Sequence, residues 1–111
     1  MIVKLPKTDY ELSIYNILNS KEYANLVPGE RAILYDLATQ EIPKYVNVHW
    51  ESLDLNDYIH NIKLSYIKHK NQIGLNVVCA CINDALPNYI ATLEGTGFDK
   101  KLIISDNIYF K

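Results

Sequence analysis

The sequence has few of the residues that would place it outside the ordinary globular proteins. Four glycines and four prolines among 111 residues are too few for a fibrous or low-complexity chain, and a hydrophobic fraction of 49% is too high for an intrinsically disordered one. No apolar run approaches the roughly 18 residues of a membrane-spanning helix, and the N-terminus lacks the apolar region of a signal peptide. We therefore expect one cytoplasmic domain, residues 1–111, with no membrane contact.

The chain is also poor in the residues and motifs that carry catalysis or bind metals. Its two cysteines, Cys79 and Cys81, lie too close together for an unstrained disulfide on a strand, so we expect buried thiols. The three histidines lie far apart and lack the spacing of a metal site. No G-x-S-x-G sequence or glycine-rich phosphate loop is present. These absences predict no metal, no cofactor and no catalytic residues, and they favour a role other than that of an enzyme.

Positive charge is scarce. The chain has 13 acidic and 11 basic residues, a net charge of −2, whereas nonspecific nucleic-acid binding requires a strong positive field. Residues 62–70 mix basic and aromatic residues, and residues 28–39 could open a helix-turn-helix, but no convincing recognition helix follows. We therefore do not expect nucleic-acid binding. Residues 1–61, with nine acidic and five basic side chains, carry most of the negative charge.

Three stretches have the boundary residues and the apolar spacing of helices. Thr8 to Glu11 fits a capping box, and apolar residues at helical spacing follow it, which predicts a helix over about residues 9–20. Pro28 suits the first turn of a second helix, which should end before Pro43. A third helix is predicted over residues 54–70, with the aspartate at its start as the N-cap.

Five other stretches are predicted strands. Residues 45–50 alternate, with Val46, Val48 and Trp50 on one side, which is the period of a half-buried strand. Residues 74–82 are apolar and uncharged, as in a strand covered on both faces. The remaining three are an opening strand and a terminal hairpin that turns at residues 105–107, namely residues 2–5, 102–104 and 108–110.

A fourth helix completes the expected fold. It would begin around Asp84 to Pro87, where a proline is tolerated in the first turn, and end at Gly95. The predicted class is α/β (α+β), in the order β-α-α-β-α-β-α-β-β. We expect a mixed sheet of about five short strands with about four helices packed on it.

Both ends of the chain share a pattern with a known family. Apolar residues 77–81 are followed by Asn83, Ala85, Glu94 and the pair Gly97-Phe98. This pattern resembles the last strand, helix and turn of GNAT-type acetyltransferases, and residues 1–19 are similar to that family's opening strand and helix. The resemblance implies an acyl-coenzyme A-dependent enzyme. The family's glycine-rich cofactor loop has no counterpart here, and Leu93 stands where the family often has a tyrosine acid. The alternative function is a degenerate or dimer-completed acetyltransferase.

Aromatic residues with a polar tip are enriched, with nine tyrosines and one tryptophan. Such residues are favoured at the centres of protein interfaces. Trp50 runs directly into three acidic residues, and this arrangement suits a basic protein surface; alternatively, Trp50 lies in the core and the acids complement a helix dipole. We predict a small protein-binding module, of the inhibitor or immunity type, whose partner is another protein and whose binding residues are Trp50, Glu51, Asp54, Asp57 and Tyr58.

Overall fold

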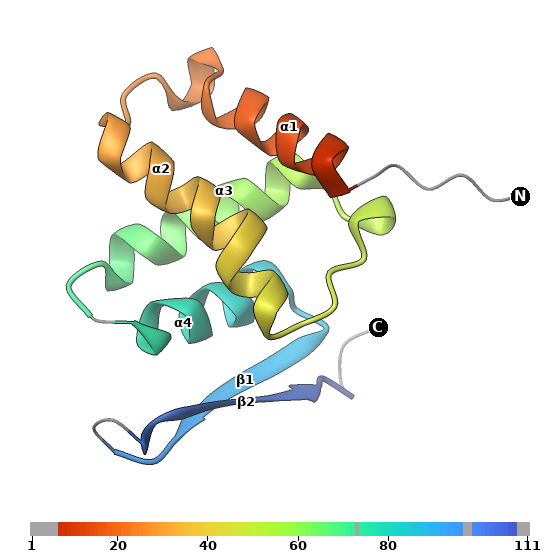
Figure 1. Cartoon of the computed structure of the whole chain (residues 1–111), viewed down its shortest axis with the longest axis vertical. Helices are drawn as coiled ribbons and strands as arrows, with labels where there is room; N and C mark the ends of the chain where they lie inside the picture. Colours follow the sequence, from red (N-terminus) through yellow and green to blue (C-terminus); the bar gives the residue numbers. More distant parts are fainter. Residues whose placement is uncertain (1–6, 73, 97–98, 109–111) are drawn as a thin grey trace, which may run out of the picture.

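The computed structural model describes residues 7–72, 74–96 and 99–108 (Figure 1). The predicted strand at residues 2–5 lies outside these ranges. The elements follow in the order α1 (Lys7–Leu18), η1 (Lys21–Tyr23), α2 (Pro28–Asp36), η2 (Leu37–Glu41), η3 (Ile42–Lys44), η4 (Trp50–Ser52), α3 (Leu55–His69), α4 (Leu75–Ala85), β1 (Tyr89–Glu94) and β2 (Lys101–Asp106).

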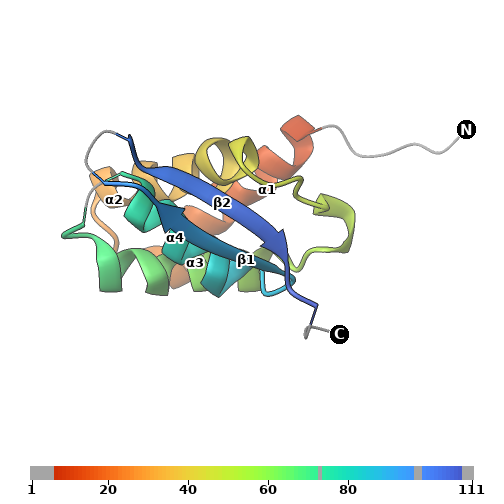
Figure 2. The same cartoon turned by 90° about the horizontal axis from the view of Figure 1, so that it is seen from below.

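The class is α+β, but the predicted sheet of about five strands is wrong. The described chain has four α-helices, and its sheet has two antiparallel strands, β1 and β2. Helix α3 packs against α1 and α2 on one side and against α4 on the other. The hairpin lies across α4, on the side away from α3 (Figure 2). The apolar faces of all four helices therefore meet in one core, and the hairpin covers its edge.

The three helices predicted first are present. Pro28 lies in the first turn of α2, and α3 begins after Asp54 as expected. The helical path does not end cleanly before Pro43, because η2, a π-helical turn, and η3, a 3₁₀ turn that contains Pro43, continue it to Lys44. Thr39, fully buried in η2, donates its hydroxyl to the Tyr35 carbonyl at 2.7 Å. This bond satisfies the polar group that η2 brings into the core.

The stretch at residues 74–82, predicted to be a strand, is helix α4. Because α3 and the hairpin cover two sides of this helix, it is as apolar as a buried strand, and an apolar run alone cannot distinguish the two. The prediction of a fourth helix that ends at Gly95 is also wrong, because strand β1 occupies this stretch. The buried residues of α4 follow helical spacing, namely Val77, Val78, Cys81, Ile82 and Ala85.

The strand register of the hairpin places its turn at a different position from the predicted one. Tyr89 pairs with Asp106 and Glu94 pairs with Lys101, so the predicted turn at residues 105–107 is wrong and the chain reverses at residues 95–100. Gly95 has a φ of +91°, and a Cβ there would lie 2.5 Å from the carbonyl oxygen of Asp99. The turn therefore requires glycine at this position.

Asn83 fixes the hairpin to α4. Its side-chain amide donates to the carbonyl of Ala91 at 2.9 Å, and its Oδ1 accepts the Ala91 N–H at 2.8 Å. The thiol of Cys79 donates to the same carbonyl at 3.3 Å. Ala91 is buried, so these bonds satisfy backbone groups on the strand edge that faces the helix.

Arg31 holds the corner between α1 and α2. Its Nε donates to the carbonyl of Leu18 at 2.8 Å. Its Nη2 donates to the carbonyls of Tyr23 at 3.0 Å and Leu26 at 3.4 Å. The guanidinium therefore satisfies carbonyls from the end of α1, from η1 and from the loop that leads to α2.

Candidate functional site

Trp50 lies in a cluster of three aromatic rings. Its indole stacks on the ring of Tyr10, with centroids 5.6 Å apart and planes at 19°. It meets the ring of Tyr58 edge-on, at 5.9 Å and 86°. Tyr10 and Tyr58 are buried, whereas Trp50 is only partly buried and packs against the outside of the core. The structure thus places Trp50 between the two alternatives, with part of the ring in the core and part at the surface.

Tyr58 is the most deeply buried residue of this aromatic cluster. Its side chain is 1% exposed, and its hydroxyl donates to the carbonyl of Ala38 at 2.9 Å. Burial raises the pKa of the hydroxyl far above its ordinary value. Tyr58 is one of the predicted partner-binding residues, but its buried ring contacts Trp50 and is not accessible to a partner.

The predicted acidic residues lie at the start of α3. Asp54 is the N-cap, and its Oδ1 accepts the backbone N–H groups of Asn56 at 3.0 Å and Asp57 at 3.2 Å. Glu51, in η4, and Asp57, in the first turn of α3, are exposed. The structure therefore brings all three carboxylates to the end of the molecule where Trp50 lies.

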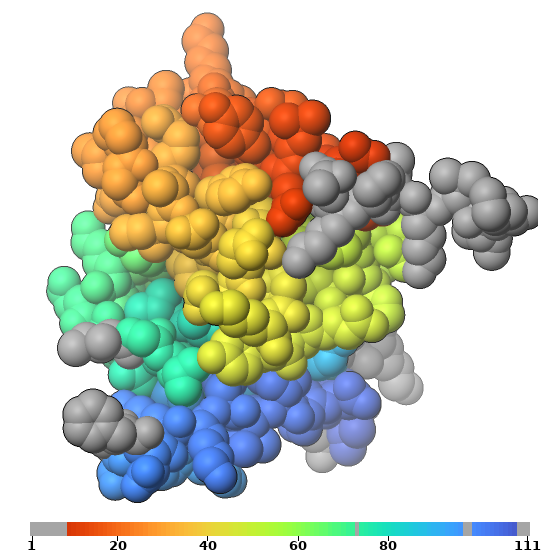
Figure 3. All heavy atoms as spheres, in the orientation of Figure 1, coloured from red at the N-terminus to blue at the C-terminus, as the bar shows by residue number. Residues whose placement is uncertain are grey.

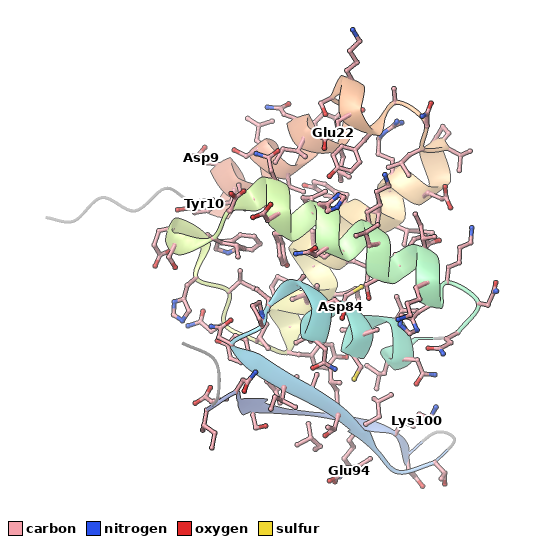
Figure 4. All side chains as sticks on the ribbon, turned by 180° about the vertical axis from the view of Figure 1, so that it is seen from behind. Asp9, Tyr10, Glu22, Asp84, Glu94 and Lys100 are labelled. Carbon is pink, nitrogen blue, oxygen red and sulfur yellow. The ribbon has the colours of Figure 1, made fainter. Side chains whose placement is uncertain are left out.

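Asp9 is a fourth acidic residue at this end that the sequence reasoning missed. It is exposed in the first turn of α1, directly before Tyr10, whose ring stacks on Trp50. Figure 4 shows Asp9 beside the beginning of α3. Its position at a helix start was a visible signal, but only the fold brings the starts of α1 and α3 together.

A surface groove of about 430 Å³ adjoins Trp50. Figure 3 shows the part of the chain that follows α2, in yellow, exposed between the orange helix α2 and the blue hairpin. Lys44 lines the groove, but its ammonium donates to Glu41 Oε2 at 3.0 Å, and this bond raises the pKa of Lys44. The groove is lined by Pro43, Lys44, Tyr45, Val46, Asn47, Val48 and Trp50.

The stretch at residues 45–50, which lines most of the groove, is not the predicted strand: Tyr45 still has helical dihedral angles and Val46 lies at a bend. Among the described residues it pairs with no other strand, and Trp50 already belongs to η4. The predicted alternation is nevertheless present. Val46 and Val48 are buried at 6% and 8% exposure, whereas Asn47 and His49 are exposed. Val46 and Val48 therefore attach this stretch to the core.

The thiols offer no nucleophile. Cys81 is fully buried, and burial raises its pKa to about 11, partly offset by the Ser65 hydroxyl beside it. Burial also raises the pKa of Cys79. Within residues 7–72, 74–96 and 99–108, no three His, Cys, Asp or Glu side chains gather where they could hold a metal ion.

The structure has a helix where the acetyltransferase resemblance implies a strand, and a strand where it implies a helix. Residues 77–81, expected as a strand, lie in α4, and the expected helix before Gly95 is strand β1. Gly97 and Phe98 lie outside the described residues. The local architecture on which the resemblance depends is therefore not observed.

Comparison with protein-family models, with curated proteins and with solved structures finds no match to this chain. Within the part of the chain that the structure describes, no helix is both long and apolar enough to cross a bilayer.

Proposed function

We propose that this chain is a small protein-binding module that docks a basic segment of a partner protein at Trp50, its groove and the adjoining acidic residues. One observation carries the proposal. Trp50 is held on one face by Tyr10 and at an angle by Tyr58, and yet it still lines an open groove. Docking needs a rigid apolar anchor of this kind.

The two tyrosines make Trp50 a suitable anchor. A free surface tryptophan loses rotamer freedom when a partner covers it, and this loss weakens binding. Here the stacking on Tyr10 and the edge contact with Tyr58 already restrict the indole. The remaining exposed part of the ring can therefore be buried by a partner at a low entropic cost.

The carboxylates give the site its preference for positive charge. Asp9, Glu51, Asp54 and Asp57 are exposed, the last three in η4 and at the start of α3, directly after Trp50 in the chain. Exposed charges contribute little affinity each, but together they raise the rate of association with a basic surface and disfavour an acidic one. Such a module would act as an inhibitor or immunity-type protein does, by covering a basic surface of its target.

The single tryptophan of the chain reports directly on this site. We would titrate the protein with a short capped peptide that alternates lysine and valine and follow Trp50 fluorescence. The emission should change saturably, and the apparent affinity should fall as salt is added because exposed charges are screened. A peptide that alternates glutamate and valine should leave the emission unchanged. Equal binding of the two peptides would contradict the proposal.

Charge variants locate the binding. The double change Asp54→Asn and Asp57→Asn removes two charges, and asparagine at position 54 can still cap α3. This variant should bind the lysine peptide about tenfold more weakly. The matched control, Asp84→Asn with Glu94→Gln, removes two charges from α4 and β1, away from this end (Figure 4). The control should bind as the unchanged protein does, and a comparable loss in both variants would exclude this surface.

A further inference from the structure

We infer that two copies of this chain pair through strand β2, antiparallel and about a two-fold axis, so that their hairpins form one four-stranded sheet. Such pairing uses the hairpin and is separate from the proposed docking of a basic segment at Trp50. The sheet of the described chain has two strands, and a two-stranded sheet is only marginally stable on its own. Its two edges differ in what covers them.

The edge on β1 is closed by α4. In an antiparallel pair, successive residues direct their backbone N–H and C=O groups alternately toward the partner strand and away from it. Both backbone groups of Ala91 bond to the side chain of Asn83 on α4, so they point away from β2. The N–H of Tyr89, two residues earlier, donates to the carbonyl of Leu86 at 3.0 Å. The outward groups of β1 therefore already have partners.

The same alternation identifies the outward groups of β2. Ala91 is opposite Ile104, so Ile104 also directs its N–H and C=O away from the partner strand. Leu102 and Asp106, each two residues away, share this direction. Outside the pairing of β1 with β2, no hydrogen bond among the described residues involves the backbone groups of these three residues. The edge on β2 is therefore open.

A bond just beyond the strands confirms the assignment. The N–H of Asn107 donates to the carbonyl of Asn88 at 3.0 Å, and these two residues continue the register of the hairpin. The odd-numbered residues of β2 therefore face β1, and the even-numbered ones face outward. None of the six residues of β2 is buried, and Figure 3 shows the hairpin, in blue, at the surface of the molecule.

The open edge lacks the features that protect natural sheet edges. Such edges are usually blocked by lysines, prolines or bulges. Residues 102–105 are Leu-Ile-Ile-Ser, without a charge or a proline, and the register runs without a bulge from Lys101 to Asp106. Ile103 is 40% exposed. A regular, apolar edge with free backbone groups is a template for another strand.

The charges of β2 favour a second copy as that strand. Its two charged residues have opposite signs, Lys101 at the start and Asp106 at the end. Antiparallel pairing centred on Ile104 places Asp106 of one copy opposite Leu102 of the other, next to Lys101. Opposite charges then meet at both ends, whereas a foreign strand of one charge would be matched at one end and repelled at the other.

This register also uses the whole edge. The free groups of all three outward residues in each copy find partners, and the two-fold axis closes the assembly at a dimer. On the face toward α4, the partly buried Ile104 side chains of the two copies become direct neighbours. On the outer face, Ile103 of each copy lies opposite Ser105 of the other.

Sedimentation equilibrium of the full chain tests the pairing. Between about 10 μM and about 1 mM it should show a monomer–dimer equilibrium. Ile103→Lys adds a charge to the exposed face of the edge strand and should weaken the dimer at least about tenfold. The matched control, Thr92→Lys, puts the same side chain on β1, directly opposite position 103. It should dimerise as the unchanged protein does. A monomer at every concentration, or equal weakening in both variants, would overturn the inference.

Amide hydrogen exchange of the unchanged protein provides a readout that needs no variant. In a concentrated sample the Ile104 N–H should exchange at least about tenfold more slowly than in a dilute one, because it would donate to the other copy. The Ile103 N–H, directed to β1, is the internal control and should be protected equally in both samples. A dimer in which Ile104 exchanges at the same rate as in the monomer would pair through another surface, and strand pairing would be overturned.

Discussion

Residues 46–49 and strand β1 both have buried and exposed side chains in alternation, but they are stabilised differently. In β1, Ala91 is buried and both of its backbone groups bond to Asn83, while the strand pairs with β2 along its other edge. In residues 45–50, Val46 and Val48 are buried, but among the described residues this stretch pairs with no strand. Alternation therefore records which face of a stretch is buried, and it does not record whether the backbone has a partner.

The difference follows from what each stretch is connected to. A turn of a few residues returns the chain from β1 to β2, so pairing needs little loop-closure entropy. Residues 45–50 lie between η3 and η4, and the next long element on each side is a helix. Nothing close in sequence can supply a second strand there.

The largest expected effect comes from breaking the attachment of residues 45–50 to the core. Val48→Asp would place a carboxylate at a position that is 8% exposed, and we expect a loss of about 3 kcal/mol in the free energy of unfolding. Asn47→Asp puts the same group on the exposed face and should change stability by less than about 0.5 kcal/mol. Urea denaturation followed by circular dichroism measures both. Equal losses would mean that the alternation does not describe this stretch.

The next effect comes from releasing the hairpin. Asn83→Ala removes both bonds to the backbone of Ala91, and leaving these groups unsatisfied should cost about 2 kcal/mol. Amides of β1 should exchange faster, while Trp50 fluorescence stays as it is. The control is Asn76→Ala on the same helix, for which no such bonds exist in the described structure. A change in Trp50 emission in the Asn83 variant would show that the two regions are not independent.

The smallest effect tests the core that both regions share. Burial raises the pKa of Cys81 from an ordinary value of 9.0 to about 11. Between these values the unfolded chain has lost the thiol proton and the folded chain keeps it, so rising pH favours unfolding. Stability should be unaffected by this group below pH 9 and should fall by about 1.4 kcal/mol by about pH 10.

Cys81→Ala provides the comparison for the pH experiment. Its stability should decline less steeply over this interval, although burial of the Tyr58 hydroxyl adds a decline of the same sign at higher pH. Urea denaturation at several pH values, followed both by Trp50 emission and by circular dichroism, makes the measurement. If the pH dependence of the variant matches that of the unchanged protein, Cys81 does not titrate as its burial implies.

The parts of the fold that the sequence predicts correctly depend on local signals. Asp54 caps α3 as predicted, because a cap needs only the backbone of the next turn. Tyr58, Ile59 and Ile62 are buried on α3 because helical spacing places them on one face. The buried and exposed residues among 46–49 are also predicted correctly, because their alternation is a local pattern of the chain.

The errors arise where the surroundings decide. Val77, Val78 and Cys81 satisfy a buried helix as well as a buried strand, and only the position of α4 between α3 and the hairpin distinguishes the two. The candidate site divides in the same way. The acidic residues that follow Trp50 are visible in the sequence. The stacking of Trp50 on Tyr10 is not, because Tyr10 lies in α1 and only the fold brings it to Trp50.

The corner held by Arg31 affects how the protein can be handled chemically. Every other basic residue besides histidine in the sequence is a lysine, so reagents that acylate amines would neutralise the lysine side chains and leave this guanidinium untouched. A lysine could not replace it, because one ammonium on a flexible stem does not present the planar fork that reaches carbonyls of Leu18 and Tyr23 together. Amine-directed labels and surface immobilisation are therefore compatible with an intact junction between the first two helices.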